Sequence, residues 1–342
     1  MNAFGPVHAE LEPGARNAVE VCLTVQRGER VAIIADEESV AVAASLAAAV
    51  DAAEAQCDPV LLEAVSTRPL SEAPEPVLEA LRRADAGILC IQPRQGELKV
   101  RMQIVQLVEQ RRIRYAHMIG VTPLIMTQGM RTDYRLVDSL SDRLLQRVRN
   151  GSGLRVRTKG GTDFRAVFDP AMEWVKTSGL ISRRYWSNLP AGEVFTTPGS
   201  IDGVFVCDGT AGDYFNAKYG DLSATPMRLE IAGGRLVSVA CRRLELQREF
   251  WAYCHTDENS NRVGELAFGT NLGVQEMIGV LLQDEKIPGI HMAFGDPYGS
   301  QTGADWKSST HVDVLTRQCD VWIDDDQVIA GGRYLLDRLG LS

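Results

Sequence analysis

The sequence predicts an α/β N-terminal domain with a small parallel sheet over residues 1–150, followed by an α+β, β-rich domain over residues 151–342. A length of 342 residues is enough for two domains of roughly 150 residues, each able to bury a core. The first part alternates short apolar runs with helical stretches, which is typical of a parallel sheet. The second part is rich in glycine turns and poor in helical periodicity.

The expected elements of the N-terminal domain follow one another as strand, helix and strand. We expect buried strands at 30–36, 59–62 and 86–91, and helices at 39–55, 77–84 and 98–112. The turn after the first strand reads Ala-Asp-Glu-Glu-Ser instead of a glycine-rich phosphate loop, so a dinucleotide site is not supported. The cluster Arg111-Arg112-Ile113-Arg114 fits the solvated C-terminal end of the last of these helices.

The β-rich domain begins with a strand, a glycine turn and a second strand over residues 156–165. Glycine turns recur further along the chain, and a helical pattern returns only at 272–283. These features predict an antiparallel sheet with a helix or two packed against it.

Composition excludes several classes of protein. The net charge is -9, and both halves of the chain are acidic, so we expect no nucleic-acid partner. No apolar run reaches the roughly 20 residues of a membrane span, and the N-terminus lacks a secretory signal, so we expect a cytoplasmic protein without a membrane partner. The seven dispersed cysteines contain no C-x-x-C pair, which indicates free thiols.

The segment Thr310 to Leu315 carries the clearest ligand pair. Side chains alternate across a strand, so His311 and Asp313 share one face while Val312 and Val314 point to the other. A His and a carboxylate at this spacing can bind one metal ion or form a structural hydrogen-bonded pair.

Two further segments, 265–273 and 291–299, share an Ala-Phe-Gly core. Each places a potential ligand, Glu265 or His291, on the same face as a small Ala, with bulky apolar residues on the opposite face. The alternative interpretation is two amphipathic strands of an ordinary sheet. Glu193 follows a Pro and a Gly in segment 188–198, where it is either a metal ligand or an exposed edge glutamate.

Together these side chains change the interpretation. Three carboxylates and two imidazoles are a ligand mixture that Zn, Mn, Co and Fe accept. Two such ions, bridged by one carboxylate, activate water and polarise a carbonyl at the same time. The sequence therefore predicts that the β-rich domain is a metal-binding domain with two divalent ions. The set consists of Glu193, Glu265, His291, His311 and Asp313.

Four strings in this order resemble the metal-binding blocks of the aminopeptidase T (thermophilic aminopeptidase) family. They are N-L-P-A-G-E-V-F-T-T-P at 188–198, G-E-L-A-F-G-T-N at 264–271, D-E-K-I-P-G-I-H-M-A-F-G at 284–295 and S-S-T-H-V-D at 308–313. The resemblance extends to the Arg131–Tyr134 stretch and the Gly160–Asp163 turn. It implies that the five residues above are ligands of a two-metal site and that Tyr298 is an active-site hydroxyl near the reacting carbonyl.

The chain departs from the family in two respects: Val312 stands where the family usually has Trp, and the N-terminal half is short. In both features the chain resembles a smaller branch with the same fold, the 2,5-dihydroxypyridine dioxygenases. These enzymes open an aromatic ring with one iron, and they carry a His at the position equivalent to Glu265. We expect a metalloaminopeptidase-like hydrolase that acts on a short peptide or small amide as a homodimer, with Glu265 and Tyr298 in catalytic roles. A non-haem Fe(II) ring-cleaving dioxygenase is the alternative, and a catalytically silent binding protein is the third.

Overall fold

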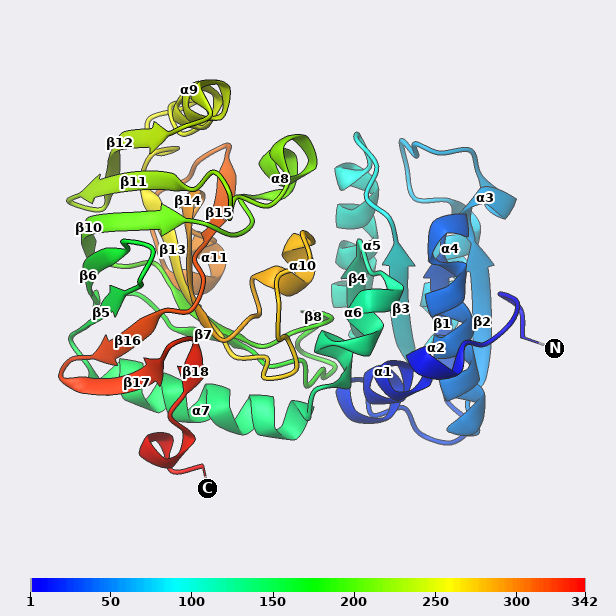
Figure 1. Ribbon diagram of the computed structural model, residues 1–342. Helices are drawn as coiled ribbons and strands as arrows, with labels where there is room; N and C mark the ends of the chain where they lie inside the picture. The colour runs from blue at the N-terminus through cyan, green and yellow to red at the C-terminus, as the bar shows by residue number, and fades with distance from the viewer. Residues whose placement is uncertain (1, 342) are drawn as a thin grey trace. The chain divides into compact units, whose positions relative to one another are not determined.

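The computed structural model describes residues 2–341, which form two compact units (Figure 1). The first unit contains the chain up to Arg135 together with Gly179–Ala191, and the second contains Leu136–Ser178 and Gly192 onward. Helix α7, Tyr134–Asn150, lies almost wholly in the second unit because Leu140, Leu144 and Val148 are buried in that unit's core. The domain division at residue 150 stays a prediction.

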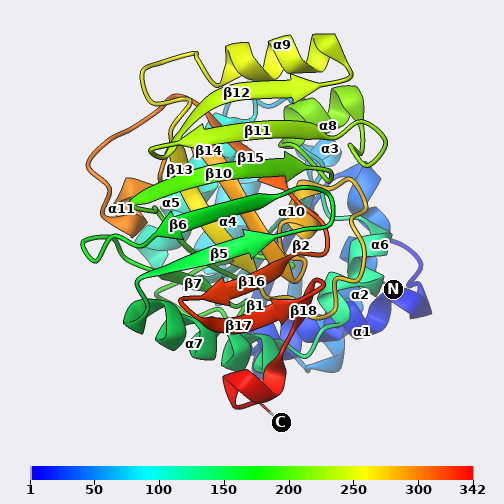
Figure 2. The same cartoon turned by 60° about the vertical axis from the view of Figure 1, so that its left-hand side comes forward.

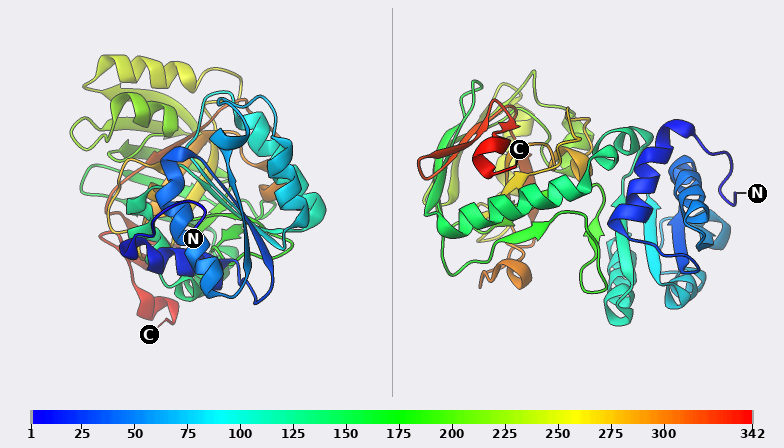
Figure 3. Two further views of the ribbon diagram at one scale, coloured as in Figure 1. Left: turned by 90° about the vertical axis from the view of Figure 1, so that its right-hand side faces the viewer. Right: turned by 90° about the horizontal axis from the view of Figure 1, so that it is seen from below.

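The first unit is built on a parallel five-stranded sheet in the order β2-β1-β3-β4-β8, so the predicted parallel sheet is confirmed. Figure 3 shows helices on both faces of this sheet. Its strands are β1 Arg30–Ala35, β2 Gln56–Leu61, β3 Ala86–Ile91, β4 Arg114–Ile119 and β8 Ser187–Asn188. Its helices are α1 Glu12–Arg16, α2 Val40–Ala52, α3 Leu62–Val65, α4 Glu75–Arg83, α5 Leu98–Arg111 and α6 Pro123–Thr127.

One part of the predicted basic cluster is wrong. Arg111 and Arg112 are exposed at the end of α5, but Arg114 is buried and begins strand β4. Its guanidinium donates to the carbonyl oxygens of Leu23 and Thr24, both at 2.8 Å, and pairs with Glu29. Arg114 is thus an internal hydrogen-bond donor, and the solvated helix end stops before it.

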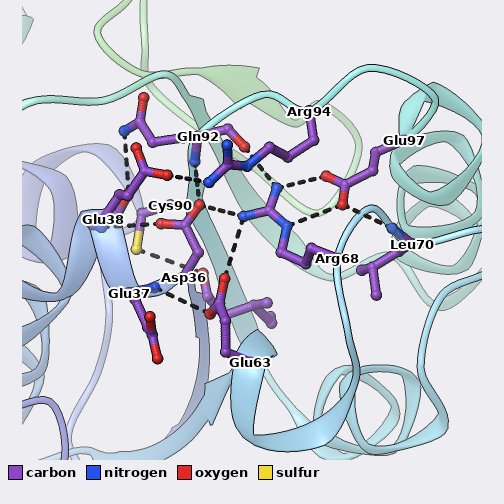
Figure 4. Close-up of polar contacts among 12 residues, drawn as sticks. Asp36, Glu37, Glu38, Glu63, Arg68, Leu70, Cys90, Gln92, Arg94 and Glu97 are labelled. Carbon is purple, nitrogen blue, oxygen red and sulfur yellow. Dashed lines mark hydrogen bonds and ion pairs between the residues drawn. The ribbon is translucent and has the colours of Figure 1, made fainter.

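A buried ion-pair network closes the carboxyl edge of this sheet between β1 and β3 (Figure 4). Arg68 reaches in from the loop after α3 and pairs with Asp36, just beyond β1, and with Glu97, just before α5. It also donates to the backbone oxygen of Gln92, just beyond β3, at 2.7 Å. Parallel sheets of this strand order commonly bind ligands at that edge. Here the guanidinium of Arg68 lies at that edge between Asp36 and Glu97.

The second unit is a sandwich of two antiparallel sheets, so the predicted β-rich character is confirmed. Figure 2 shows the larger sheet in front, with strands β13 to β15 crossing behind it. The larger sheet runs β12-β11-β10-β6-β5-β16-β17-β18 and the smaller sheet runs β15-β14-β13-β9-β7. Phe164 and Phe205 of the larger sheet lie in one core cluster with Phe268 and Phe294 of the smaller.

The elements of this unit are as follows. The larger sheet contains β5 Gly153–Arg157, β6 Asp163–Val167, β10 Ser200–Cys207, β11 Met227–Ala232, β12 Arg235–Cys241, β16 Asp320–Ile323, β17 Asp326–Ala330 and β18 Arg333–Tyr334. The smaller sheet contains β7 Val175–Thr177, β9 Glu193–Thr196, β13 Val263–Gly269, β14 Gly289–Gly295 and β15 His311–Leu315. The shorter helices are α8 Asp213–Tyr219, α9 Leu244–Tyr253, α10 Leu281–Asp284 and α11 Gly299–Thr302.

The helix predicted at 272–283 is wrong over most of its length, because α10 covers only four residues. The Asn271 side chain accepts from the backbone N–H of Gly273, and the Asp284 carboxylate accepts from the N–H groups of Ile278 and Gly279. Side chains therefore satisfy donors that a helix would pair with its own carbonyls, which is how Asn and Asp compete with helices. Among residues 2–341, no helix is long and apolar enough to cross a membrane.

Candidate metal centre

One face of the smaller sheet carries the five predicted ligands. In the antiparallel register, His291 lies opposite Ala267, Ala293 lies opposite both Glu265 and Asp313, and Gly269 lies opposite Glu193. Directly opposed residues share a face, so all these side chains project from one side of the sheet. The alternating residues, such as Phe268, Met292 and Val314, are buried on the other side in the core. The predicted pattern of ligand and small Ala on one face is therefore what the register produces.

His291 lies between two carboxylates. Its Nε2 is 2.9 Å from Glu193 Oε1 and 3.5 Å from Glu265 Oε1. All three side chains are buried, so Glu193 is not an exposed edge residue. Although the contacts are short, His291 Nε2 makes no hydrogen bond of acceptable geometry and is a buried polar atom without a partner. A ring nitrogen in this position among carboxylate oxygens fits the sharing of a cation.

His311 is oriented by a second contact. Its Nδ1 lies 2.9 Å from the backbone oxygen of Asp296, to which it donates as an N–H group. This leaves Nε2 free to act as a ligand, and it lies 3.6 Å from Asp313 Oδ1. A hydrogen bond that fixes the tautomer in this way is a usual feature of metal-binding histidines.

Three groups of side chains within residues 2–341 bring ligand atoms within 4.8 Å of one another. The first is Glu193, Glu265 and His291; the second is Glu265, His311 and Asp313; the third is Glu285, His291 and Asp313. Glu265 belongs to the first and second groups, and a carboxylate has the two oxygens needed to serve two ions. All five predicted ligands thus converge: Glu265 is shared by the first two groups, and His291 and Asp313 recur in the third.

Two charged residues of this site were not predicted from the sequence. Lys286 is buried, with its Nζ 2.7 Å from Glu193 Oε2 and 2.8 Å from Glu285 Oε1. Both residues stand in the D-E-K-I-P-G string at 284–289, directly after the short helix α10. That string was the available signal, but a charged pair beside a turn is ordinarily assigned to solvent, so its burial was not apparent.

Tyr298 lies beside His311, with ring centroids 4.6 Å apart, and it is partly exposed. Its backbone has φ of 50°, a left-handed conformation that is rare for an aromatic residue and is found preferentially at functional sites. His255, in contrast, makes local contacts: Nδ1 lies 2.7 Å from the Trp251 backbone oxygen, and the two rings stack at 4.0 Å. These contacts are with Trp251 of α9, so His255 caps the end of that helix locally.

At each ionisable side chain of the site, burial and the neighbouring charges shift the pKa in opposite directions. Burial lowers the pKa of His291, but Glu193 and Glu265 outweigh this and raise it to about 10. Burial likewise lowers the pKa of His311, but Asp313 and Glu265 raise it to about 10. Burial raises the pKa of Glu193, but Lys286 and His291 outweigh it and lower the value to about 2. Both imidazoles therefore hold protons at neutral pH in the absence of a cation.

Comparisons with known proteins place this geometry in context. A curated relative, 2,5-dihydroxypyridine 5,6-dioxygenase of Pseudomonas putida, is 23% identical over 202 residues, and the match spans 56% of each chain, about half the relative's length. The solved 2,5-dihydroxypyridine dioxygenase from P. putida has a TM-score of 0.68 at 17% identity, covering 96% of this chain and 98% of that one. Wild-type AmpT from Thermus thermophilus has a TM-score of 0.62 at 18% identity, covering 95% and 99%. These structures establish the shared fold.

The family model described as thermophilic metalloprotease (M29) matches residues 142–324, which include all five predicted ligands and Tyr298. This match covers more than half of the chain and agrees with the resemblance seen in the sequence. The chain belongs to the thermophilic metalloprotease (M29) family.

Proposed function

We propose that this protein is a metal-dependent hydrolase that cleaves the amide bond of a short peptide or a small amide, in the manner of an aminopeptidase. The observation that carries the proposal is the pair of ligand groups that share Glu265. Two divalent ions, of Zn, Co, Mn or Fe, would be held by Glu193 and His291 on one side and by His311 and Asp313 on the other. Two such ions supply activated water and a polarised carbonyl.

The protein's own residues have distinct roles in this proposal. Glu265 belongs to both ligand groups, so its carboxylate would help to hold both ions. Tyr298 donates a hydrogen bond to the carbonyl oxygen of the substrate as negative charge develops there. Burial and the surrounding carboxylates raise the pKa of Tyr298, so its phenol keeps the proton that it donates.

The alternative is a mononuclear iron dioxygenase, because the curated relative and one similar solved structure are both named 2,5-dihydroxypyridine dioxygenase of P. putida. Such a site needs two imidazoles and one carboxylate around one iron. Within residues 2–341, none of the candidate groups contains both His291 and His311. The ligand arrangement therefore supports the hydrolase over the dioxygenase. A cytoplasmic location and a homodimeric assembly stay predictions.

The purified protein is expected to bind about two transition-metal ions per chain and to lose amide hydrolysis on chelation. The reason is that the carboxylates of Glu193, Glu265 and Asp313 are buried close together, and divalent ions neutralise them when the imidazoles give up their protons to act as ligands. Elemental analysis, combined with hydrolysis of amino-acid amides and oxygen consumption on a hydroxylated pyridine, tests this. Full hydrolysis by metal-free protein contradicts the metal dependence of the proposed hydrolase, and one iron with oxygen-dependent ring opening favours the dioxygenase.

The apparent affinity for Co²⁺ is expected to rise with pH between about pH 6 and pH 8. His291 and His311 carry protons below their pKa of about 10, whereas a metal ion binds only the neutral ring. Each ion that takes an imidazole therefore releases about one proton, so its affinity increases about tenfold per pH unit. Calorimetry in buffers of different ionisation enthalpy counts the protons. Metal binding without proton release contradicts the imidazole ligands.

A further inference from the structure

The buried Lys286 ammonium contacts the carboxylates that the proposed metal ions require. Its Nζ is within hydrogen-bond distance of Glu193 Oε2 and Glu285 Oε1, at 2.7 Å and 2.8 Å. The other oxygen of Glu193, Oε1, faces His291. Lys286 thus pairs with one oxygen of Glu193, and the other oxygen of Glu193 faces His291 of the first ligand group.

The backbone holds Lys286 in this position. Its N–H donates to the carbonyl of Gln283 at 2.9 Å, and its carbonyl accepts from Asn271 at 3.0 Å. The adjacent strand ends at Gly269, where an added Cβ would come within 2.0 Å of the Ile287 oxygen and 2.8 Å of the Lys286 carbonyl carbon. The absence of a side chain at Gly269 therefore lets the 285–287 segment lie directly against the strand that carries Glu265.

The charges around Lys286 indicate its function. Glu193, Glu265 and Asp313 are buried carboxylates, Glu285 beside them is half-buried, and Lys286 is the lysine in direct contact with this cluster among the described residues. The ammonium attracts the same carboxylates that attract a dication and repels the dication itself. A fixed positive charge in this position stabilises the metal-free site and weakens metal binding.

We propose that Lys286 is a built-in electrostatic competitor of the metal ions, which keeps the metal-free site folded and lowers metal affinity so that the ions exchange. This inference rests on the proposed metal centre and adds a means of regulating it. Stability and metal binding are linked. If Lys286 stabilises the metal-free protein more than the metal-bound protein, the free energy of metal binding becomes less favourable by that difference.

The test is a competition between Lys286→Met protein and a chelator of known affinity for Zn²⁺ at fixed pH. We expect Zn²⁺ to bind about tenfold to a hundredfold more tightly than to the unmodified protein, as for one charge removed at close range. The melting temperature should fall in metal-free Lys286→Met protein and fall less with saturating Zn²⁺. Lys286→Arg keeps the charge and should keep the affinity within about threefold.

Glu285→Gln is the matched opposite change, and it also serves if Lys286→Met fails to fold. It removes a carboxylate from the third ligand group, so Zn²⁺ should bind less tightly than to the unmodified protein. Unchanged or weaker Zn²⁺ binding by Lys286→Met, or unchanged binding by Glu285→Gln, overturns the competitor role while the metal centre stands. Failure of the unmodified protein to bind Zn²⁺, Co²⁺ or Mn²⁺ at all would instead remove the proposed function.

Discussion

Replacing Glu265 with His is expected to abolish amide hydrolysis and to leave at most one metal ion per chain. Glu265 lies in both ligand groups, and its carboxylate offers two oxygens, whereas a neutral imidazole offers one nitrogen lone pair. We expect hydrolysis to fall by at least about a thousandfold, on the scale of losing an electrophilic group from an active site. Elemental analysis and amide-hydrolysis assays on the same preparation measure both effects.

The same substitution also discriminates between the two enzyme classes. With His at position 265, the second ligand group becomes two imidazoles and Asp313, the set that a mononuclear Fe(II) site uses. We therefore expect the variant to retain one Fe(II) while losing hydrolysis. Glu230→His is the control, because Glu230 is exposed on strand β11 and should tolerate the change with two ions bound. Two ions and undiminished hydrolysis in Glu265→His would rule out the shared-carboxylate site.

The face of the smaller sheet that carries the ligands was predictable, because side chains alternate between the two faces of a strand with a period of two residues. The alternation of Glu265, Ala267 and Gly269 with Leu266 and Phe268 has a period of two, and the structure has that period. The opposing segment at 291–295 carries the same pattern, so antiparallel pairing placed both ligands on one side. Local sequence thus predicted each strand, and the resemblance to a family predicted that the four segments converge.

Other features depend on contacts that local sequence does not encode. Lys286 and Glu285 lie in a turn that ordinarily faces solvent, and only the close approach at Gly269 brings them to the carboxylates. Helix α7 has a strongly charged surface, and its apolar residues at 140, 144 and 148 pack against the core of the second unit. The local sequence does not show which core they cover. Arg68 likewise stands in a polar loop, and nothing local indicates that its guanidinium is buried.

Replacing Arg68 with Met is expected to destabilise the first unit by about 3–5 kcal/mol, the usual cost of removing one partner from a buried ion pair. The side chain is 6% exposed, and its partners Asp36 and Glu97 are 1% and 2% exposed (Figure 4). Methionine fills part of the volume but leaves two buried carboxylates without their cation. Urea denaturation followed by circular dichroism measures the change in the free energy of unfolding.

The pH dependence of that loss identifies its cause. In the unmodified protein, burial would raise the pKa of Glu97, but hydrogen bonds from Arg68 and the Leu70 amide lower it, so Glu97 stabilises the fold above its unfolded pKa. Without Arg68, burial dominates and the pKa of Glu97 in the folded state rises. The folded variant therefore keeps a proton on Glu97 that the unfolded chain releases, so the variant loses stability as pH increases. The deficit should therefore be smaller near pH 5 than near pH 8.

Arg94→Met is the control, because Arg94 is 48% exposed and its pair with Glu38 is worth at most about 1 kcal/mol. An equal loss in both variants, or a deficit that does not change with pH, would show that the Arg68 network is not a buried ion pair of this strength.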